Sequence, residues 1–161
     1  MKNCIVKLIE VKSDSDYEIA MRLFKEYASQ IKIDLGFQNF NEEIENLESK
    51  YSRPKGVIYI AYDHENSPLG CFGIRAFNNT VCELKRMYLK EEARGLGIGK
   101  LMMKKSITVG KELGYDKMRL DTLSSMLPAV SLYKKSGFYE IDPYCFNPIE
   151  EAKYFEINLK E

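Results

Sequence analysis

Apolar residues recur along this chain with two periods, one typical of helices and one typical of strands. Apolar positions three and four residues apart predict helices over 17–31, 44–51, 98–113 and 129–133. Alternating or continuous apolar residues predict strands over 5–11, 57–62, 69–77, 81–89, 118–121, 138–141 and 154–159. The three strands between 57 and 89 follow one another through short turns, which favours an antiparallel meander.

No linker, repeat or low-complexity tract interrupts this series of elements. A chain of 161 residues is long enough to bury one substantial core. We therefore predict a single α+β domain over residues 1–161.

The balance of charged residues and the lack of long apolar runs argue against two classes of binding partner, nucleic acids and membranes. Lysine and arginine together number 24, and so do aspartate and glutamate, so the formal net charge is zero. A nucleic-acid-binding domain usually carries a basic excess, so we expect no nucleic-acid partner. No apolar run approaches the ~20 residues that span a bilayer, and the N-terminus lacks the apolar core of a signal peptide. We expect no membrane partner.

Cysteine and histidine usage argues against a metal centre. Cys4, Cys71, Cys82 and Cys145 form no Cys-x-x-Cys pair, and His64 is the only histidine and stands in a polar turn. Scattered cysteines of this kind indicate reduced, mostly buried thiols in a cytoplasmic protein. A zinc site and a Ser-His-Asp triad are both disfavoured.

The most informative motif is Arg-Gly-Leu-Gly-Ile-Gly-Lys at 94–100, between a predicted strand and a predicted helix. Glycine allows close approach of the backbone to an anion, and a helix start adds unpaired N–H groups and a positive dipole end. The motif predicts a phosphate-binding turn. It is not a P-loop, because Arg94 replaces the first glycine and Leu101 replaces the hydroxyl residue. A dinucleotide Gly-x-Gly-x-x-Gly pattern also fails, ending on Lys100 or Met102.

The spacing that does fit is Arg-x-x-Gly-x-Gly, given by Arg94, Gly97 and Gly99. With this motif the chain resembles the GNAT superfamily of acetyl-CoA-dependent N-acetyltransferases. The segment Glu83–Leu89 is similar to that family's fourth strand, and Ala129–Phe138 matches its Ala-x-x-Leu-Tyr-x-x-x-Gly-Phe element.

The resemblance extends over most of the chain. Residues 120–123 and 143–148 are similar to a poorly characterised branch, which supplies a fold but no substrate. The resemblance implies a three-layer αβα arrangement of the α+β class. Its mixed, mostly antiparallel sheet has about six or seven strands and is flanked by about four helices. Dimers are common in the family, so the resemblance is compatible with a homodimer.

The resemblance also implies acetyl-CoA as donor, with no metal. It assigns coenzyme A to the main chain of a set of residues on the fourth strand and the glycine loop. These are Met87, Tyr88, Leu89, Arg94, Gly95, Leu96, Gly97, Ile98, Gly99 and Lys100. One departure is Met126, where many members have asparagine; the missing polar contact could come from Ser124 or Ser125.

Acetyl transfer to an amine needs a base for the ammonium, whose pKa is ~10.4 in lysine, and an acid for the departing thiolate. Glu83 is the candidate base, directly or through water, because some family members use a glutamate there. Strand alternation predicts Glu83, Lys85 and Met87 on one face; the alternative is a surface glutamate paired with Lys85. Tyr133 is the candidate acid, and the alternative is helix packing. The oxyanion donor is expected to be a main-chain N–H, such as that of Met87.

The acceptor-binding residues are expected in the loop between the first two helices and in the stretch before the last strand. They are Phe37, Gln38, Phe40, Tyr144 and Asn147. Aromatic rings with a few polar groups suit a small amine with an apolar part, although the rings could equally cover the core.

The leading prediction is an N-acetyltransferase that moves the acetyl group of acetyl-CoA directly to a primary amine of a small molecule. A protein or peptide N-acetyltransferase and a non-catalytic acyl-CoA-binding module remain as alternatives.

Overall fold

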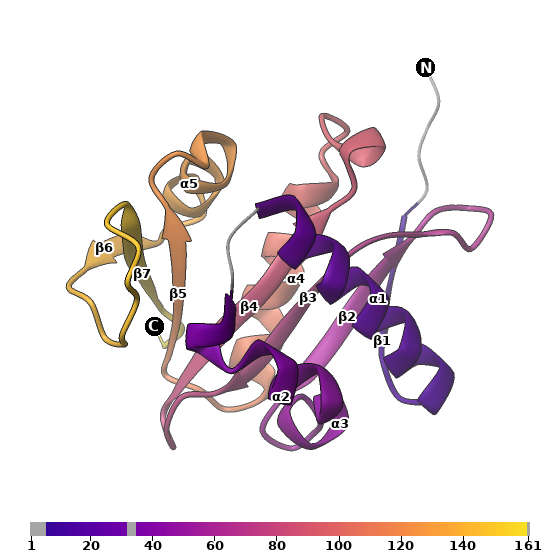
Figure 1. Ribbon diagram of the computed structural model, residues 1–161, viewed down its shortest axis with the longest axis horizontal. Coiled ribbons are helices and arrows are strands. Elements are labelled where there is room, and N and C mark those ends of the chain that lie inside the picture. Colours follow the sequence, from indigo (N-terminus) through magenta and orange to yellow (C-terminus); the bar gives the residue numbers. More distant parts are fainter. Residues whose placement is uncertain (1–5, 32–34, 161) are drawn as a thin grey trace.

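One seven-stranded sheet forms the middle layer of the computed structural model, which describes residues 6–31 and 35–160 (Figure 1). Its strands are β1 Lys7–Glu10, β2 Val57–Tyr62, β3 Pro68–Ala76, β4 Val81–Leu89, β5 Lys117–Leu123, β6 Tyr139–Ile141 and β7 Ala152–Asn158. Their order in the sheet is β1-β2-β3-β4-β5-β7-β6. Every neighbouring pair is antiparallel except β4 and β5, so the predicted mixed, mostly antiparallel sheet is confirmed.

Helices cover both faces of this sheet and complete the predicted three layers. They are α1 Asp14–Ile31, α2 Phe40–Glu45, α3 Leu47–Lys50, α4 Ile98–Glu112 and α5 Leu127–Lys135, with short 3-10 turns at Leu35–Gln38 and Glu91–Ala93. In Figure 1, α1, α2 and α3 lie in front of the sheet and α4 behind it. No helix among the described residues is both long and apolar enough to cross a bilayer.

Two hydrophobic clusters lie on the two faces, as period-2 alternation in the strands requires. In β2, for example, Ile58 and Ile60 face the cluster under α1, while Val57, Tyr59 and Ala61 face the cluster under α4 and α5. Both faces of the central strands are therefore buried, which explains their nearly continuous apolar sequence.

The helix predicted over 44–51 is interrupted, so the described residues contain five α-helices where about four were expected. Asn46 separates α2 from α3, with φ of −131°. Its side-chain amide donates a hydrogen bond to the Glu42 carbonyl at 2.8 Å. Asparagine competes with helical hydrogen bonding in this way, which ends α2 one turn early.

The predicted placement of histidine and cysteine is also largely seen. His64 lies in an exposed turn beside Glu65. Cys71 and Cys82 are buried in strands, whereas Cys145 is exposed. Cys4 lies outside the described residues.

A β-bulge in β4 changes which side chains share a face. Cys71 of β3 pairs with Tyr88 and Gly73 pairs with Lys85, so β4 carries one extra residue there. Arg86 takes up this residue with φ of 56°. Glu83 and Lys85 therefore remain on the α1 and α2 side, but Met87 packs against the cluster on the α4 side. The prediction that all three share one face was wrong, because a bulge shifts the alternation by one position.

Candidate active site

A cleft opens where β4 and β5 separate. The two strands pair only from Val81–Lys117 to Glu83–Arg119, although both continue beyond that point. The resulting β4–β5 cleft has a volume of about 660 Å³ and is bounded by both strands, by the start of α4 and by α5. Among the predicted residues that line it are Met87, Tyr88, Leu89, Arg94, Gly99 and Tyr133.

The glycine loop at one end of this cleft presents unsatisfied N–H groups. Within the described residues, nothing accepts a hydrogen bond from the main-chain N–H groups of Gly95 to Lys100. Gly95 and Gly97 have φ of 80° and 82°, and a Cβ added at either would meet no atom within 4 Å. The loop is thus an open cradle of donors at the positive end of α4, which fits a diphosphate. Leu96, Ile98 and Lys100 contribute main-chain groups to the same turn.

Arg94 holds the loop in place. Its Nε donates to the Leu89 carbonyl at 3.0 Å, and its Nη2 donates to Gln30 Oε1 at 2.9 Å. These bonds connect the loop to the end of β4 and to α1. The guanidinium therefore has a structural role while it also lines the cleft.

Tyr133 of α5 packs in the core and also lines the β4–β5 cleft, so its position is compatible with both roles considered from the sequence. Its ring packs against Phe138 and Phe155, with centroids 6.0 and 6.3 Å away. Burial raises the pKa of its phenol above the usual value of 10. The same residue lines the β4–β5 cleft. A phenol of raised pKa stays protonated at neutral pH, as a proton donor must.

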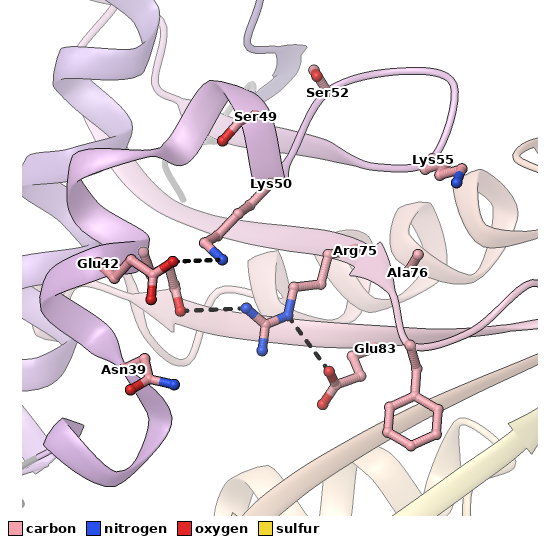
Figure 2. A pocket seen from close by; sticks show the side chains of 11 residues that line it. Asn39, Glu42, Ser49, Lys50, Ser52, Lys55, Arg75, Ala76 and Glu83 are labelled. Atoms are coloured by element: carbon pink, nitrogen blue, oxygen red, sulfur yellow. Dashed lines mark ion pairs between the residues drawn. The ribbon is translucent and has the colours of Figure 1, made fainter.

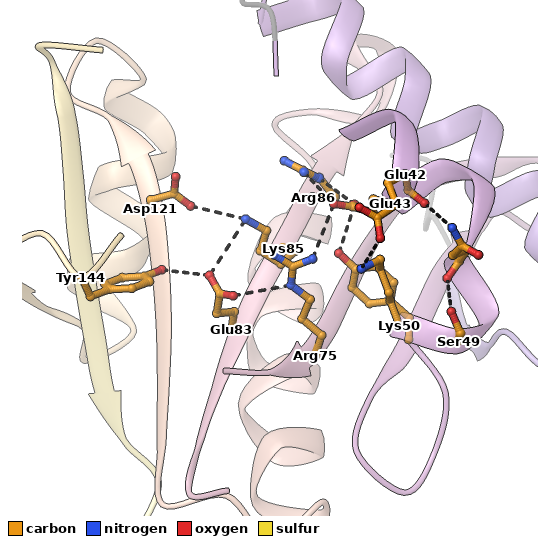
Figure 3. Close-up of polar contacts among 12 residues, drawn as sticks. Glu42, Glu43, Ser49, Lys50, Arg75, Glu83, Lys85, Arg86, Asp121 and Tyr144 are labelled. Carbon is orange, nitrogen blue, oxygen red and sulfur yellow. Dashed lines mark hydrogen bonds and ion pairs between the residues drawn. The ribbon is translucent and has the colours of Figure 1, made fainter. Parts of the chain in front are cut away.

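Glu83 lies at the vertex of the cleft, in the last residue pair that joins β4 to β5. The Tyr144 hydroxyl donates to its Oε2 at 3.3 Å, while Arg75 Nε and Lys85 Nζ lie 3.5 and 4.0 Å from its carboxylate (Figure 3). Glu83 and Tyr133 do not line the same cavity: Glu83 faces a separate polar hollow. The predicted pairing with Lys85 is present, and a direct meeting of Glu83 with Tyr133 is not.

Asp121 of β5 is a site residue that sequence reasoning missed. It lines both the β4–β5 cleft and a small hollow beside it. Lys85 Nζ lies 3.8 Å from its Oδ1, so one buried lysine joins Asp121 to Glu83 (Figure 3). The available signal was an acidic residue inside a predicted strand, but the register that places it opposite β4 cannot be read from the sequence.

Only some of the predicted acceptor residues lie near Glu83, Lys85 and Asp121. Tyr144 contacts Glu83, and Asn147 Nδ2 donates to Asp121 Oδ2 at 3.5 Å. Phe40 lies 5.2 Å below the Arg86 guanidinium. Phe37 and Gln38 belong to a 3-10 turn, but their side chains lie outside what the structure describes.

Met126 immediately precedes α5 and lines the β4–β5 cleft together with Ser125. Its sulfur lies 4.0 Å from the Thr122 hydroxyl. Of the two serines considered as polar substitutes for an asparagine here, Ser125 is the one that reaches this cleft.

The polar hollow that Glu83 lines has a volume of about 430 Å³ and lies between α2–α3 and β3–β4 (Figure 2). Three carboxylates and three cations line it: Glu42, Glu43, Glu83, Lys50, Lys55 and Arg75. Its volume falls in the range of small-molecule sites, about 300–1,000 Å³.

Comparison with known proteins points to one family. Residues 16–138 match the model of the acetyltransferase (GNAT) family. An uncharacterized N-acetyltransferase of Schizosaccharomyces pombe is 38% identical over 100% of this chain and 99% of its own length.

Solved structures agree in fold. A GNAT-family acetyltransferase from Staphylococcus aureus superimposes with a TM-score of 0.80 at 26% identity, covering 97% of this chain and 100% of the other. A GNAT-family acetyltransferase from Elizabethkingia anophelis, crystallised with acetyl-CoA bound, gives a TM-score of 0.69 at 19% identity. That comparison covers 95% of this chain and 97% of the other.

Proposed function

The chain belongs to the acetyltransferase (GNAT) family, and from this premise we propose that it transfers the acetyl group of acetyl-CoA directly to a primary amine of a small molecule. The observation that carries the proposal is the β4–β5 cleft. It joins the open N–H cradle at Gly95–Lys100 to Tyr133 and Asp121.

The donor's binding follows from the main chain along this cleft. The N–H groups of Gly95 to Lys100 bind the diphosphate of coenzyme A. The free edge of β4 at Met87 to Leu89 contacts the extended pantetheine arm of the same cofactor. This edge is unpaired with β5, because the β4–β5 pairing ends at Glu83. Acetyl-CoA, bound in this way, supplies the acetyl group as a thioester. The Elizabethkingia anophelis neighbour, which has acetyl-CoA bound, supports the choice of donor.

Tyr133 supplies the proton that the departing thiolate needs. Its phenol faces the cleft and is held by packing against two phenylalanine rings. Because burial raises its pKa, the phenol is protonated throughout the neutral range. A positioned acid of this kind typically contributes 10²–10⁴-fold to the rate.

The amine proton leaves through the connected group of Asp121, Lys85 and Glu83. Asp121 is the carboxylate of this group that faces the cleft, and Lys85 lies within 4.0 Å of both carboxylates. Burial lowers the pKa of Lys85, so its ammonium can give a proton to Glu83 and take one up on the Asp121 side. Glu83 is thus the last proton acceptor of this group, and it does not contact the reacting amine directly.

A small acceptor fits this geometry better than a protein segment. The loop that carries Tyr144 and Asn147 covers the carboxylates from one side, and α2 closes the polar hollow from the other. The space left is that of a small-molecule pocket.

The test is thiol release from acetyl-CoA with a panel of amines. We expect Tyr133→Phe to lower kcat by about 10²-fold or more with little change in the KM for acetyl-CoA. Tyr62→Phe, a matched loss of one hydroxyl on β2, should leave both constants unchanged. Glu83→Gln and Asp121→Asn should each lower kcat, and the double variant should lose less than the product of the two effects, because the residues act as one group.

Three outcomes would contradict the proposal in different ways. An unchanged kcat in Tyr133→Phe removes Tyr133 from the mechanism. Acetyl label that appears only on proteins in a cell extract favours a protein N-acetyltransferase. Coenzyme A binding without turnover of any amine favours a binding module.

A further inference from the structure

The polar hollow is an unusual acceptor site because its inner wall is charged and largely buried. Arg75 is 23% exposed and lies between Glu83 and Glu43, whose side chains are 10% and 1% exposed (Figure 3). Burying charges is costly unless they are paired, so the balance of charge here bears on what the hollow binds.

Other cations also lie beside the two carboxylates that Arg75 approaches. Glu43 accepts hydrogen bonds from Arg86 Nη2 at 2.8 Å and Nε at 3.0 Å. Glu83 lies 4.0 Å from Lys85 Nζ. Arg75 approaches the same two carboxylates only at 3.5 and 3.7 Å, longer than the 2.7–3.2 Å of a well-formed N–H···O bond. Lys85 is shared with Asp121 at 3.8 Å, so the charges of this buried group are balanced. Arg75, however, donates no well-formed hydrogen bond to either carboxylate, so its guanidinium can still bind an acceptor in the hollow.

A second cation lies at the rim of the hollow. Lys50 is paired with Glu42 at 3.8 Å. Lys55 has no carboxylate within ion-pair distance in the described part of the chain. The hollow as a whole thus offers a guanidinium on its wall and an ammonium at its edge to an incoming anion.

We propose that the polar hollow binds an anionic oxygen group of the acceptor, so that the substrate is a small amine that also carries a carboxylate or phosphate-like group. This inference rests on the proposed function, since it describes the acceptor of the same reaction. The anion lies against Arg75 and Lys55, and the amine end points past Glu83 toward the vertex of the β4–β5 cleft. A guanidinium fork suits a planar carboxylate in particular.

The positions of Arg75 and Lys55 disfavour polycationic acceptors. A second ammonium on the substrate would lie near Arg75 and Lys55 and would be repelled. Diamines, polyamines and lysine-rich peptides are accordingly poor ligands of this hollow, whatever their fit to the cleft.

The experiment measures binding, separately from turnover, with four amines of nearly equal length. They are 4-aminobutanoate, 3-aminopropylphosphonate, 1,4-diaminobutane and butylamine. Each is titrated by calorimetry into the full chain saturated with coenzyme A, which carries no acetyl group to transfer. We expect the two anionic amines to bind at least about tenfold more tightly than the diamine and butylamine, and the carboxylate and phosphonate arms show which oxyanion is preferred.

Variants then locate the anion. Arg75→Gln should reduce the preference for anionic amines to less than about threefold, and the exposed Lys55→Gln, which should not disturb folding, should reduce it partially. Lys111→Gln removes one exposed positive charge from α4 on the opposite face and should leave the preference unchanged.

Equal binding of all four amines, tighter binding of the diamine, or no binding of either anionic amine would overturn the inference. An anionic preference that survives both Arg75→Gln and Lys55→Gln would also overturn it. Turnover is read separately with acetyl-CoA. Anionic amines that bind in this pattern without being acetylated would leave the inference standing and would refute the proposed function instead.

Discussion

Gly97 and Gly114 have nearly the same backbone conformation at opposite ends of α4, with φ of 82° and 91°. A Cβ at either position meets no protein atom within 4 Å. The two glycines differ in what surrounds them: Gly97 lies in the open N–H cradle, and Gly114 follows the helix end. They therefore form a matched pair for separating backbone strain from ligand contact.

We predict that Gly97→Ala and Gly114→Ala each cost about 1–2 kcal/mol in the free energy of unfolding, because alanine is strained in the left-handed region. Only Gly97→Ala should also weaken coenzyme A binding, by about tenfold or more. Denaturant titration and calorimetry measure the two effects. Equal coenzyme A affinity in both variants would show that the diphosphate does not approach this loop.

At the level of single residues, local sequence motifs selected residues that the structure brings to one cleft, but they did not reveal the side-chain network beside it. Arg94, Gly97, Gly99 and Tyr133 are identified by local spacing, and all lie around one cleft or its loop. Asp121 depends on how β5 is placed against β4, which is a non-local property. No pattern within one strand could reveal it.

Among the elements, α2 is attached to the sheet through one buried ion pair. Glu43 of α2 and Arg86 of β4 are 1% and 2% exposed, and the Tyr51 hydroxyl donates to the same carboxylate at 3.1 Å. Arg86 also lies over the rings of Tyr27 and Phe40. This pair thus connects the helix to the bulge in β4.

The free energy of unfolding should depend on pH through the Glu43–Arg86 ion pair. Burial would raise the pKa of Glu43, but hydrogen bonding and charge attraction from Arg86, with Lys85 and Arg75, lower it below the usual 4.5. A lowered folded-state pKa means that the contribution to stability is complete above about pH 4.5 and is lost as the pH falls through the folded-state value.

We predict that Glu43→Gln lowers the free energy of unfolding by about 3–5 kcal/mol at pH 7, because it leaves Arg86 buried without its counter-charge. The difference from the unmodified chain should shrink below pH 4.5, since protonation removes the same charge. Glu42→Gln, one residue earlier and 64% exposed, should cost less than about 1 kcal/mol. Urea titrations from pH 3 to 7 check this. A loss for Glu43→Gln that is independent of pH would contradict it.

The bulge at Arg86 and the break at Asn46 explain why these elements were only partly predictable. Each needs a partner distant in sequence or a local hydrogen bond that competes with regular structure. The strands of the meander, by contrast, are bounded by turn residues and were predicted to within one residue at each end. Periodicity gives the elements, but tertiary contacts decide where they are interrupted.

For the whole molecule, the order of elements was sufficient to predict one α+β domain with an antiparallel meander, whereas the three layers and the mixed sheet were predicted through the resemblance to a family. The separation of β4 from β5 could not be derived from periodicity, because both strands read as ordinary strands to their ends. The candidate site thus depends on the point in the sheet at which β4 and β5, both well-formed strands, stop pairing.

The sharing of strands by both hydrophobic clusters leads to a prediction for the whole chain. β2, β3 and β4 send alternate side chains into the cluster under α1 and the cluster under α4. Neither cluster can lose its packing while those strands stay ordered. We therefore expect residues 1–161 to unfold as one domain in a single cooperative transition.

Bound coenzyme A should shift the single unfolding transition of the whole domain to higher urea concentration. At a concentration one hundred times its Kd, it should raise the free energy of unfolding by about 2.7 kcal/mol, although it contacts only the β4–β5 side of the sheet. The chain has no tryptophan and 11 tyrosines, so far-UV circular dichroism and tyrosine fluorescence are suitable probes. The two probes should give coincident urea curves with and without the ligand. Separate transitions, or stabilisation seen by one probe alone, would mean that the two faces of the sheet unfold independently and that the cleft is coupled to only one of them.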